Sequence, residues 1–231
     1  YKGFKTVYWC IDCQTALAAA EIEYEDESSP SIYVAYPMPR VGARFEALSG
    51  KEVSVIIWTT TPWTLPASMA VALQVDYEYV FVPAGNKIYL LAAELIPSVE
   101  KETGLVFGEP ILRCRGKELE GLVAIHPFYE EREVPLVLAD YVTLDSGTGC
   151  VHTAPGHGVE DFETGIRYGL EIYNPVDPTG RFLPETPLVG GLSLEDGAER
   201  VFKSLIETGR LLGRGKILHS YPHCWRCKKP I

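Results

Sequence analysis

The most strand-like run of the sequence ends in a group of hydroxyl and aromatic side chains, Thr59, Thr60, Thr61 and Trp63. Strand side chains alternate between two faces, and Pro62 ends the strand because it has no N–H to donate. Hydroxyls and an indole at a strand end can hydrogen-bond a sugar, a phosphate or a water and stack on a base. Threonine and tryptophan are also ordinary strand residues, so a purely structural role stays open.

A second polar group lies in the glycine-rich segment 145–158 and in the helix expected after it. Such a turn lets a ligand approach backbone N–H groups, and a helix start favours an anion. The titratable groups are His152, His157 and Asp161. The macrodipole keeps Asp161 ionised in the first helical turn, and an ionised carboxylate in a cleft is a natural partner for an ammonium group. Helix stabilisation by Asp161 and structural histidines are the alternatives.

The spacing of these groups disfavours several catalytic classes. His152, His157 and Asp161 straddle a loop, whereas the ligands of a His-Glu-x-x-His zinc site share one helix face. The sequence contains no Gly-x-Ser-x-Gly nucleophile motif and no dinucleotide or P-loop signature. We therefore expect no catalytic metal.

Four of the six cysteines form two Cys-x-x-Cys pairs near the chain ends, Cys10 with Cys13 and Cys224 with Cys227. Two such pairs are what a tetrahedral structural zinc site requires. The long sequence between the pairs fits an inserted domain whose stalk is clamped by the metal. Two unrelated reduced thiol pairs are the alternative, and disulfides are disfavoured because nothing else indicates an oxidising compartment.

The elements that must position these groups are mostly short strands. We expect strands at 21–25, 32–36, 52–60, 77–83, 87–91, 111–115, 121–125, 134–139 and 150–153, with a break at 28–30. Helices are expected at 92–103, from Val159 onward, and after Ser193, which forms a capping box with Asp196. Short strands at this spacing predict a β-rich α+β fold with a closed β-barrel-like core and peripheral helices.

Composition excludes other classes. With 46% hydrophobic and 23% charged residues, the 231-residue chain has the balance of a globular protein. Its 21 basic and 31 acidic residues give a net charge of −10, which excludes a protein that coats nucleic acid. No run approaches the roughly 18 apolar residues of a membrane helix. The opening residues lack an apolar signal-peptide pattern, so we expect a protein that is not secreted. We expect a cytoplasmic location, no membrane partner, and a chain that is a piece of a larger protein.

Together, the two polar groups resemble the editing insertion of isoleucyl-tRNA synthetases. The resemblance rests on segments 59–67, 147–161, 173–177 and 219–227, in the right order along nearly the whole chain. Thr61 and Trp63 are similar to the isoleucyl type, whereas valyl and leucyl relatives typically carry Thr-Thr-Arg-Pro. The His-Ile-Gly-His and Lys-Met-Ser-Lys-Ser signatures are absent, so the chain resembles an editing domain without the aminoacylation site.

This resemblance implies hydrolysis of the ester that joins a wrong amino acid, chiefly valine, to the 3′-terminal adenosine of the isoleucine tRNA. The isoleucyl enzyme is the standard example of the underlying limit, since its apolar pocket separates isoleucine from valine by only about 150-fold. Editing of another aminoacyl ester, as in valyl relatives that clear threonine, and a non-catalytic binding or spacer module are the alternatives.

The resemblance also implies roles for the residues. Asp161 would bind the α-ammonium, and His152 would wall the side-chain pocket against isoleucine. Trp63 would line the rim, and His157 would be rim or loop structure. The ribose, the carbonyl and a water would be held by Thr59, Thr60 and Thr61. His152 stays open as a general base because its ordinary pKa is near neutrality.

The implied organisation is one editing domain, residues 1–231, inserted in a larger synthetase. Residues 1–13 and 219–231 would form a zinc-knuckle stalk. A net charge of −10 is poor for holding a whole tRNA, whose affinity depends on neutralised phosphates. We therefore expect only the single-stranded end, with its valine, to enter, while the remainder of the synthetase holds the tRNA body.

Overall fold

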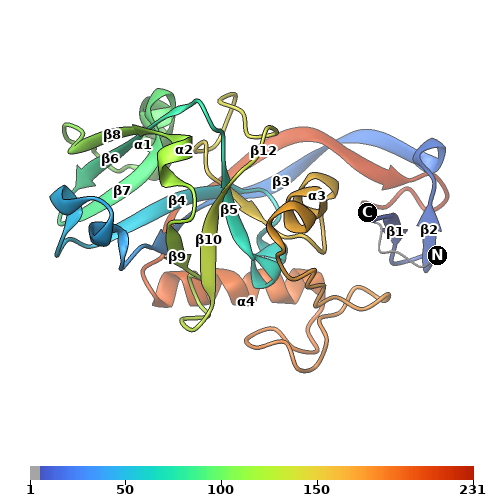
Figure 1. The fold of residues 1–231 in the computed structure, drawn as a ribbon. Coiled ribbons are helices and arrows are strands. Elements are labelled where there is room, and N and C mark those ends of the chain that lie inside the picture. Colours follow the sequence, from blue (N-terminus) through green and yellow to red (C-terminus); the bar gives the residue numbers. More distant parts are fainter. Residues whose placement is uncertain (1–5) are drawn as a thin grey trace.

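The computed structural model describes residues 6–231, and Figure 1 shows a sheet-rich body from which a long two-stranded ribbon extends. The strands are β1 Tyr8–Cys10, β2 Thr15–Leu17, β3 Ile22–Pro37, β4 Val53–Thr59, β5 Ala70–Leu73, β6 Glu78–Ala84, β7 Lys87–Ala92, β8 Leu112–Arg115, β9 Val123–Ile125, β10 Glu133–Leu138, β11 Val151–Thr153 and β12 Leu211–Cys224. The α-helices are α1 Ile96–Thr103, α2 Gly116–Leu119, α3 Val159–Tyr168 and α4 Leu194–Glu207. The 3-10 helices are η1 Ala19–Glu21, η2 Val41–Ala43, η3 Glu46–Leu48, η4 Pro62–Ala67 and η5 Ala93–Leu95.

The strands pair into three sheets. A six-stranded sheet has the order β12-β3-β4-β7-β6-β8, a four-stranded sheet the order β11-β5-β10-β9, and β1 pairs with β2. Most pairs are antiparallel, but β4 with β7 and β5 with β10 are parallel. The β-rich architecture with peripheral helices is confirmed. The pairings among the described residues do not close a barrel, so the closed-barrel prediction is not confirmed.

The extended ribbon consists of β3 and β12, which pair antiparallel from Val34 with Leu211 to Ile22 with Cys224. The expected break at 28–30 is wrong, because Pro30 lies in register with Lys216 inside the continuous strand β3. Before Ile32, β3 has a paired neighbour on one side only, and a strand with an open edge tolerates a residue without N–H. Residues 1–5 of the expected stalk lie outside the described residues.

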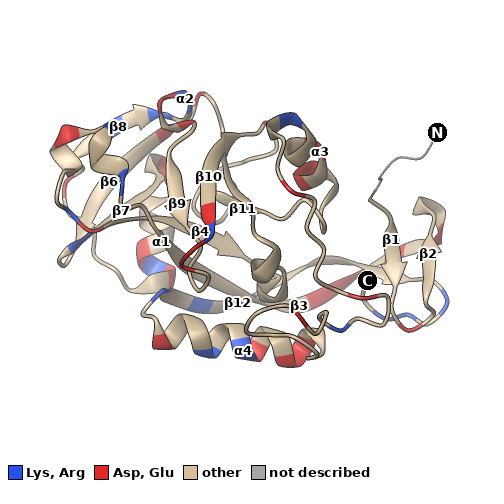
Figure 2. Cartoon of the chain, turned by 60° about the horizontal axis from the view of Figure 1, so that its bottom comes forward, with Lys and Arg blue, Asp and Glu red and all other residues tan. Residues whose placement is uncertain are grey.

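Helix α4 supports the body from one side and packs against η4 and β12. The Ser193 half of the predicted capping box is present, because the Ser193 hydroxyl accepts the N–H of Asp196 at 3.1 Å. The Asp196 carboxylate accepts the Ser193 hydroxyl at 2.7 Å in place of the Ser193 backbone N–H. Val201, Phe202 and Leu205 are buried on its inner face. Figure 2 shows acidic and basic residues alternating along the outer side of α4 and an acidic stretch of β3. The amphipathic pattern thus determines which face of α4 packs against η4.

Buried apolar strands form the main core, with Val55, Ile56 and Ile57 of β4 fully covered. In the described part of the chain, no helix has the length and apolar character that crossing a membrane requires. The short strand β5, which the sequence pattern missed, lies between β10 and β11 and holds the four-stranded sheet together.

Candidate functional site

The threonine run lies where β4 passes into η4. The Thr59 hydroxyl accepts the Thr61 N–H at 3.2 Å, and the Thr59 and Thr61 hydroxyl oxygens are 3.4 Å apart. Thr60 between them is half-buried. The backbone turns at Thr61 because Pro62 has no N–H and starts the 3-10 helix. The expected cluster of hydroxyls at this strand end is therefore present.

Thr64, one 3-10 turn after Thr61, extends this cluster to the glycine-rich segment. Its hydroxyl donates to the Thr61 carbonyl at 2.8 Å and lies 3.1 Å from Nε2 of His152. Since the hydroxyl has one proton, the arrangement places a proton on Nε2 of His152, which then donates to Thr64. No role for Thr64 was predicted from the sequence. The i to i+3 spacing was the available signal, but it required knowing that η4 is a 3-10 helix.

His152 is positioned by β11, which pairs with β5 so that His152 faces Val71 in register. Its side chain is buried, and burial together with nearby His157 lowers the pKa of His152 to about 4. The imidazole is therefore neutral near pH 7 and a weak base, which disfavours the general-base alternative. Within the described structure its Nδ1 atom is buried without a hydrogen-bond partner.

His157 and Trp63 meet across the loop and η4. Their rings are perpendicular with centroids 5.2 Å apart. Burial lowers the pKa of His157 to about 4, and its Nε2 atom is a second buried nitrogen without a partner among the described residues. These two ring nitrogens, on His152 and His157, are polar atoms that a ligand or a water can satisfy.

Asp161 lies in the first turn of α3, as predicted, but its contacts go beyond the helix. The carboxylate accepts the Ala154 N–H at 2.9 Å and the Tyr141 hydroxyl at 3.2 Å. The Tyr141 oxygen is also 3.2 Å from that of Thr153. Burial raises the pKa of Asp161. The carboxylate is thus partly desolvated and tied to the glycine-rich loop, and lone pairs remain for a cation.

The two halves of the candidate site flank the end of β11. Adjacent strand side chains point to opposite faces, so the His152 imidazole and the Thr153 hydroxyl leave β11 on opposite sides. The side chains on the His152 side of β11 are those of Thr59, Thr61, Trp63 and His157. On the Thr153 side, Tyr141 contacts both Thr153 and the Asp161 carboxylate. Gly156 allows the loop to approach segment 173–177, because a Cβ there would collide with the Tyr173 carbonyl.

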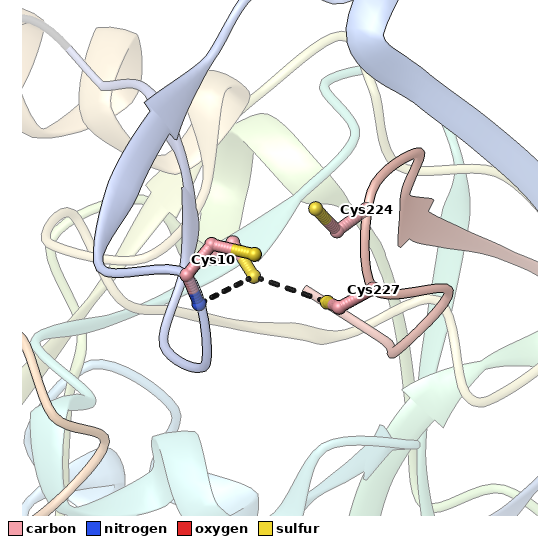
Figure 3. Close-up of side chains that lie close together, drawn as sticks. Cys10, Cys224 and Cys227 are labelled. Carbon is pink, nitrogen blue, oxygen red and sulfur yellow. Dashed lines mark hydrogen bonds between the residues drawn. The ribbon is translucent and has the colours of Figure 1, made fainter.

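The four predicted ligand cysteines form one cluster at the far end of the β3–β12 ribbon. Their sulfur atoms all lie within 4.8 Å of one another, and Sγ of Cys10 is 3.5 Å from Sγ of Cys227 (Figure 3). The β1–β2 hairpin supplies Cys10 and Cys13, the last residue of β12 is Cys224, and the turn after β12 supplies Cys227. All four are free thiols. The sulfurs are close to the separation of about 3.8 Å that tetrahedral zinc with 2.3 Å Zn–S bonds requires, so the cluster can hold a metal.

Comparisons with known proteins match this chain to synthetase editing domains and to isoleucine–tRNA ligases. The family model described as "Leucyl-tRNA synthetase, editing domain" matches residues 44–190. Isoleucine–tRNA ligase of Nitratidesulfovibrio vulgaris strain DP4 is 51% identical over 232 residues, covering 100% of this chain and 25% of the relative. The ligase of strain Miyazaki F is 54% identical over 234 residues, covering 100% of this chain and 24% of the relative. The chain spans about a quarter of the length of these relatives.

Solved structures show the same fold at low sequence identity. The editing domain of P. falciparum cytosolic leucyl-tRNA synthetase superposes with a TM-score of 0.65 at 8% identity, covering 83% of this chain and 99% of that chain. The P. knowlesi counterpart gives 0.59 at 10% identity, covering 84% and 97%. Because the editing-domain model matches residues 44–190, more than half of the chain, the chain belongs to this family of aminoacyl-tRNA synthetase editing domains.

Proposed function

We propose that this chain is the post-transfer editing domain of an isoleucyl-tRNA synthetase, which hydrolyses the valyl ester of the isoleucine tRNA and spares the isoleucyl ester. Two observations carry the proposal: the Asp161 carboxylate is tied to the Ala154 backbone at the end of β11, and a neutral histidine meets a cluster of threonine hydroxyls on the other side of that strand. About 50% identity to isoleucine–tRNA ligases over the whole chain supports the isoleucyl assignment. Because editing acts on charged tRNA, we place the chain in the cytoplasm.

In this proposal, Asp161 binds the α-ammonium that every aminoacyl ester carries. The carboxylate has lost part of its water, as its raised pKa indicates, and none of the described ion pairs involves it. A buried charge is costly until it is paired, so a cationic ligand is favoured there. The bonds from Ala154 and Tyr141 fix the oxygens, so the ammonium is bound in one orientation.

Selection by size is assigned to His152 and Thr64. The imidazole is rigid because it is buried and bonded to the Thr64 hydroxyl, so it is not free to swing away from a larger side chain. Trp63 and His157 form the adjoining rim. One extra methylene in a close-fitting pocket is worth about 1–3 kcal/mol, which is the discrimination that a second sieve must supply.

For hydrolysis, we assign positioning of a water and the ester to the hydroxyls of Thr59, Thr60 and Thr61. An aminoacyl ester is activated by its own ammonium and neighbouring ribose hydroxyl, so precise placement of the water supplies much of the rate. His152, with its pKa of about 4, is too weakly basic near pH 7 to be required as a proton acceptor. The proposal needs no catalytic metal and no covalent intermediate.

The proposed partners are the single-stranded 3′ end of the tRNA and the remainder of a parent synthetase. The net charge of −10 supports this division, since a body of acidic surface does not attract a whole tRNA. We assign residues 1–231 to one inserted domain and the ends of the chain to its stalk. The four-cysteine cluster would hold structural zinc, which would tie the β1–β2 hairpin to the end of β12.

The substitution Asp161→Asn tests the ammonium site. The asparagine side chain keeps an oxygen for the Ala154 N–H but removes the charge. We expect kcat/KM for valyl-tRNA(Ile) to fall at least about 30-fold, since losing one partner of a buried charge pair costs roughly 2–5 kcal/mol. Glu160→Gln, in the same helical turn but exposed, is the control and should change kcat/KM less than about twofold. Equal effects of the two changes, or no hydrolysis by the unchanged chain, would refute the proposal.

Replacing His152 with alanine tests the sieve. The enlarged pocket should admit isoleucine, so the preference for valyl over isoleucyl ester should fall by about tenfold or more. Deacylation of both charged forms of the isoleucine tRNA, measured in parallel, gives this ratio. His219→Ala, which changes a ribbon histidine bonded to Ser29, should leave it unchanged. Cleavage that stays restricted to the valyl ester in His152→Ala would show that His152 is not the barrier.

Metal analysis tests the cysteine cluster. We expect about one zinc per chain in freshly reduced protein and a loss of thermal stability on chelation, because structural zinc binding contributes to folding. Cys224→Ser should lose the metal, whereas Cys114→Ser, which changes a buried cysteine outside the cluster, should retain it. Less than about half an equivalent of zinc in the unchanged chain would count against the site.

A further inference from the structure

Two side chains from the segment between β9 and β10 hold η4 by its backbone. Nε2 of His126 lies 2.8 Å from the Leu65 carbonyl oxygen, and Nη1 of Arg132 donates to the Pro66 carbonyl at 2.6 Å. These are successive carbonyls near the end of η4, and the Leu65 carbonyl also accepts the Ser68 N–H at 3.0 Å. Both contacts link positions more than sixty residues apart in the sequence.

Both ring nitrogens and one face of the His126 ring make defined contacts. Its Nδ1 accepts the N–H groups of Tyr129 at 3.2 Å and Phe128 at 3.4 Å, so the proton must be on Nε2, which donates to Leu65. The ring stacks on Tyr129 with centroids 4.6 Å apart and 18° between the planes. Burial lowers the pKa of His126 to about 3, so the ring stays neutral in this one tautomer near pH 7.

Arg132 is held as firmly as His126. Its guanidinium carbon lies 4.7 Å from the ring centroid of Tyr129 and 5.4 Å from that of Tyr173. Tyr129 in turn donates its hydroxyl to the Pro187 carbonyl at 2.7 Å. A side chain stacked between two aromatic rings has little freedom, so its hydrogen bond to Pro66 restrains the backbone of η4.

The restrained backbone of η4 includes Thr64, whose contact with His152 is needed for the proposed size selection. Thr64 immediately precedes Leu65, and its hydroxyl is 3.1 Å from Nε2 of His152. We propose that His126 and Arg132 are positioning residues for editing: by clamping the Leu65 and Pro66 carbonyls, they place Thr64, and through it His152, at the separation that excludes isoleucine. The inference rests on the proposed function and adds two residues that lie outside the threonine run and the glycine-rich segment.

The test compares His126→Ala and Arg132→Ala with the unchanged 231-residue chain on valyl- and isoleucyl-tRNA(Ile). A shift of about 1 Å at a reacting group can cost up to about 100-fold in rate, so we expect kcat on the valyl ester to fall roughly tenfold. KM should stay within about twofold, because neither residue is placed at the substrate. The valyl-to-isoleucyl preference should fall about fivefold or more, since a displaced wall is less selective.

Conservative and control variants separate positioning from general stability. His126→Gln and Arg132→Lys keep a donor toward η4 and should recover part of the lost selectivity. Arg132→Met keeps the packing but not the donor, so it serves if an alanine variant fails to fold. Arg44→Ala is the matched control, because Arg44 also donates to two backbone carbonyls, those of Glu118 at 3.1 Å and Glu120 at 2.8 Å.

We expect Arg44→Ala to lower the melting temperature without changing the valyl-to-isoleucyl ratio. An unchanged ratio in Arg132→Met, with hydrolysis by the unchanged chain intact, would overturn the positioning role alone. A ratio that falls equally in Arg44→Ala would overturn it as well, since the effect would then be one of stability. Absence of hydrolysis by the unchanged chain would overturn the proposed function and this inference with it.

Discussion

The arrangement of the site depends on one partly desolvated carboxylate. Asp161 is removed from much of its water, accepts hydrogen bonds from the Ala154 backbone and the Tyr141 hydroxyl, and is not in any of the described ion pairs. A fold that keeps an anion in this state gains from a cationic ligand at the same place, because pairing offsets the cost of lost hydration. The glycine-rich loop lets the backbone come close enough to hold the carboxylate, and α3 brings Asp161 back toward the end of β11.

The strand β11 connects that anchor to the proposed sieve. Its pairing with β5 fixes His152, whose ring meets Thr64 on η4, while the next residue, Thr153, faces Tyr141 and the carboxylate. The four-stranded sheet therefore positions β11. The packing of α4 and the contacts of the β9–β10 segment position η4, which meets β11 through Thr64 and His152. Size selection needs a rigid wall, and a buried neutral histidine bonded to Thr64 provides one at less cost than a charged group would.

Local patterns predicted much of this molecule. The β-forming run of β4, the β6–β7 hairpin and the Ser193 cap each follow from neighbouring residues, and the structure has them. The break at Pro30 was wrong because its tolerance depends on an open strand edge, which is a property of the pairing and not of the residue. Tyr141, His126 and Arg132 carried no local signal, since their importance arises from contacts with distant segments. The one signal for Thr64 was its i to i+3 spacing from Thr61, which required knowing that η4 is a 3-10 helix. Whether the strands close into a barrel could likewise not be predicted from the sequence, because strand spacing does not specify which strand edges pair.

The most direct test of ammonium binding by Asp161 is a structure of the chain with a non-hydrolysable valyl-adenosine analogue. We predict that the α-ammonium lies within about 2.7–3.2 Å of a carboxylate oxygen of Asp161, with the valine side chain against His152. An analogue bound with its ammonium in solvent, or held by other groups while the Asp161 carboxylate keeps only its Ala154 and Tyr141 bonds, would contradict it.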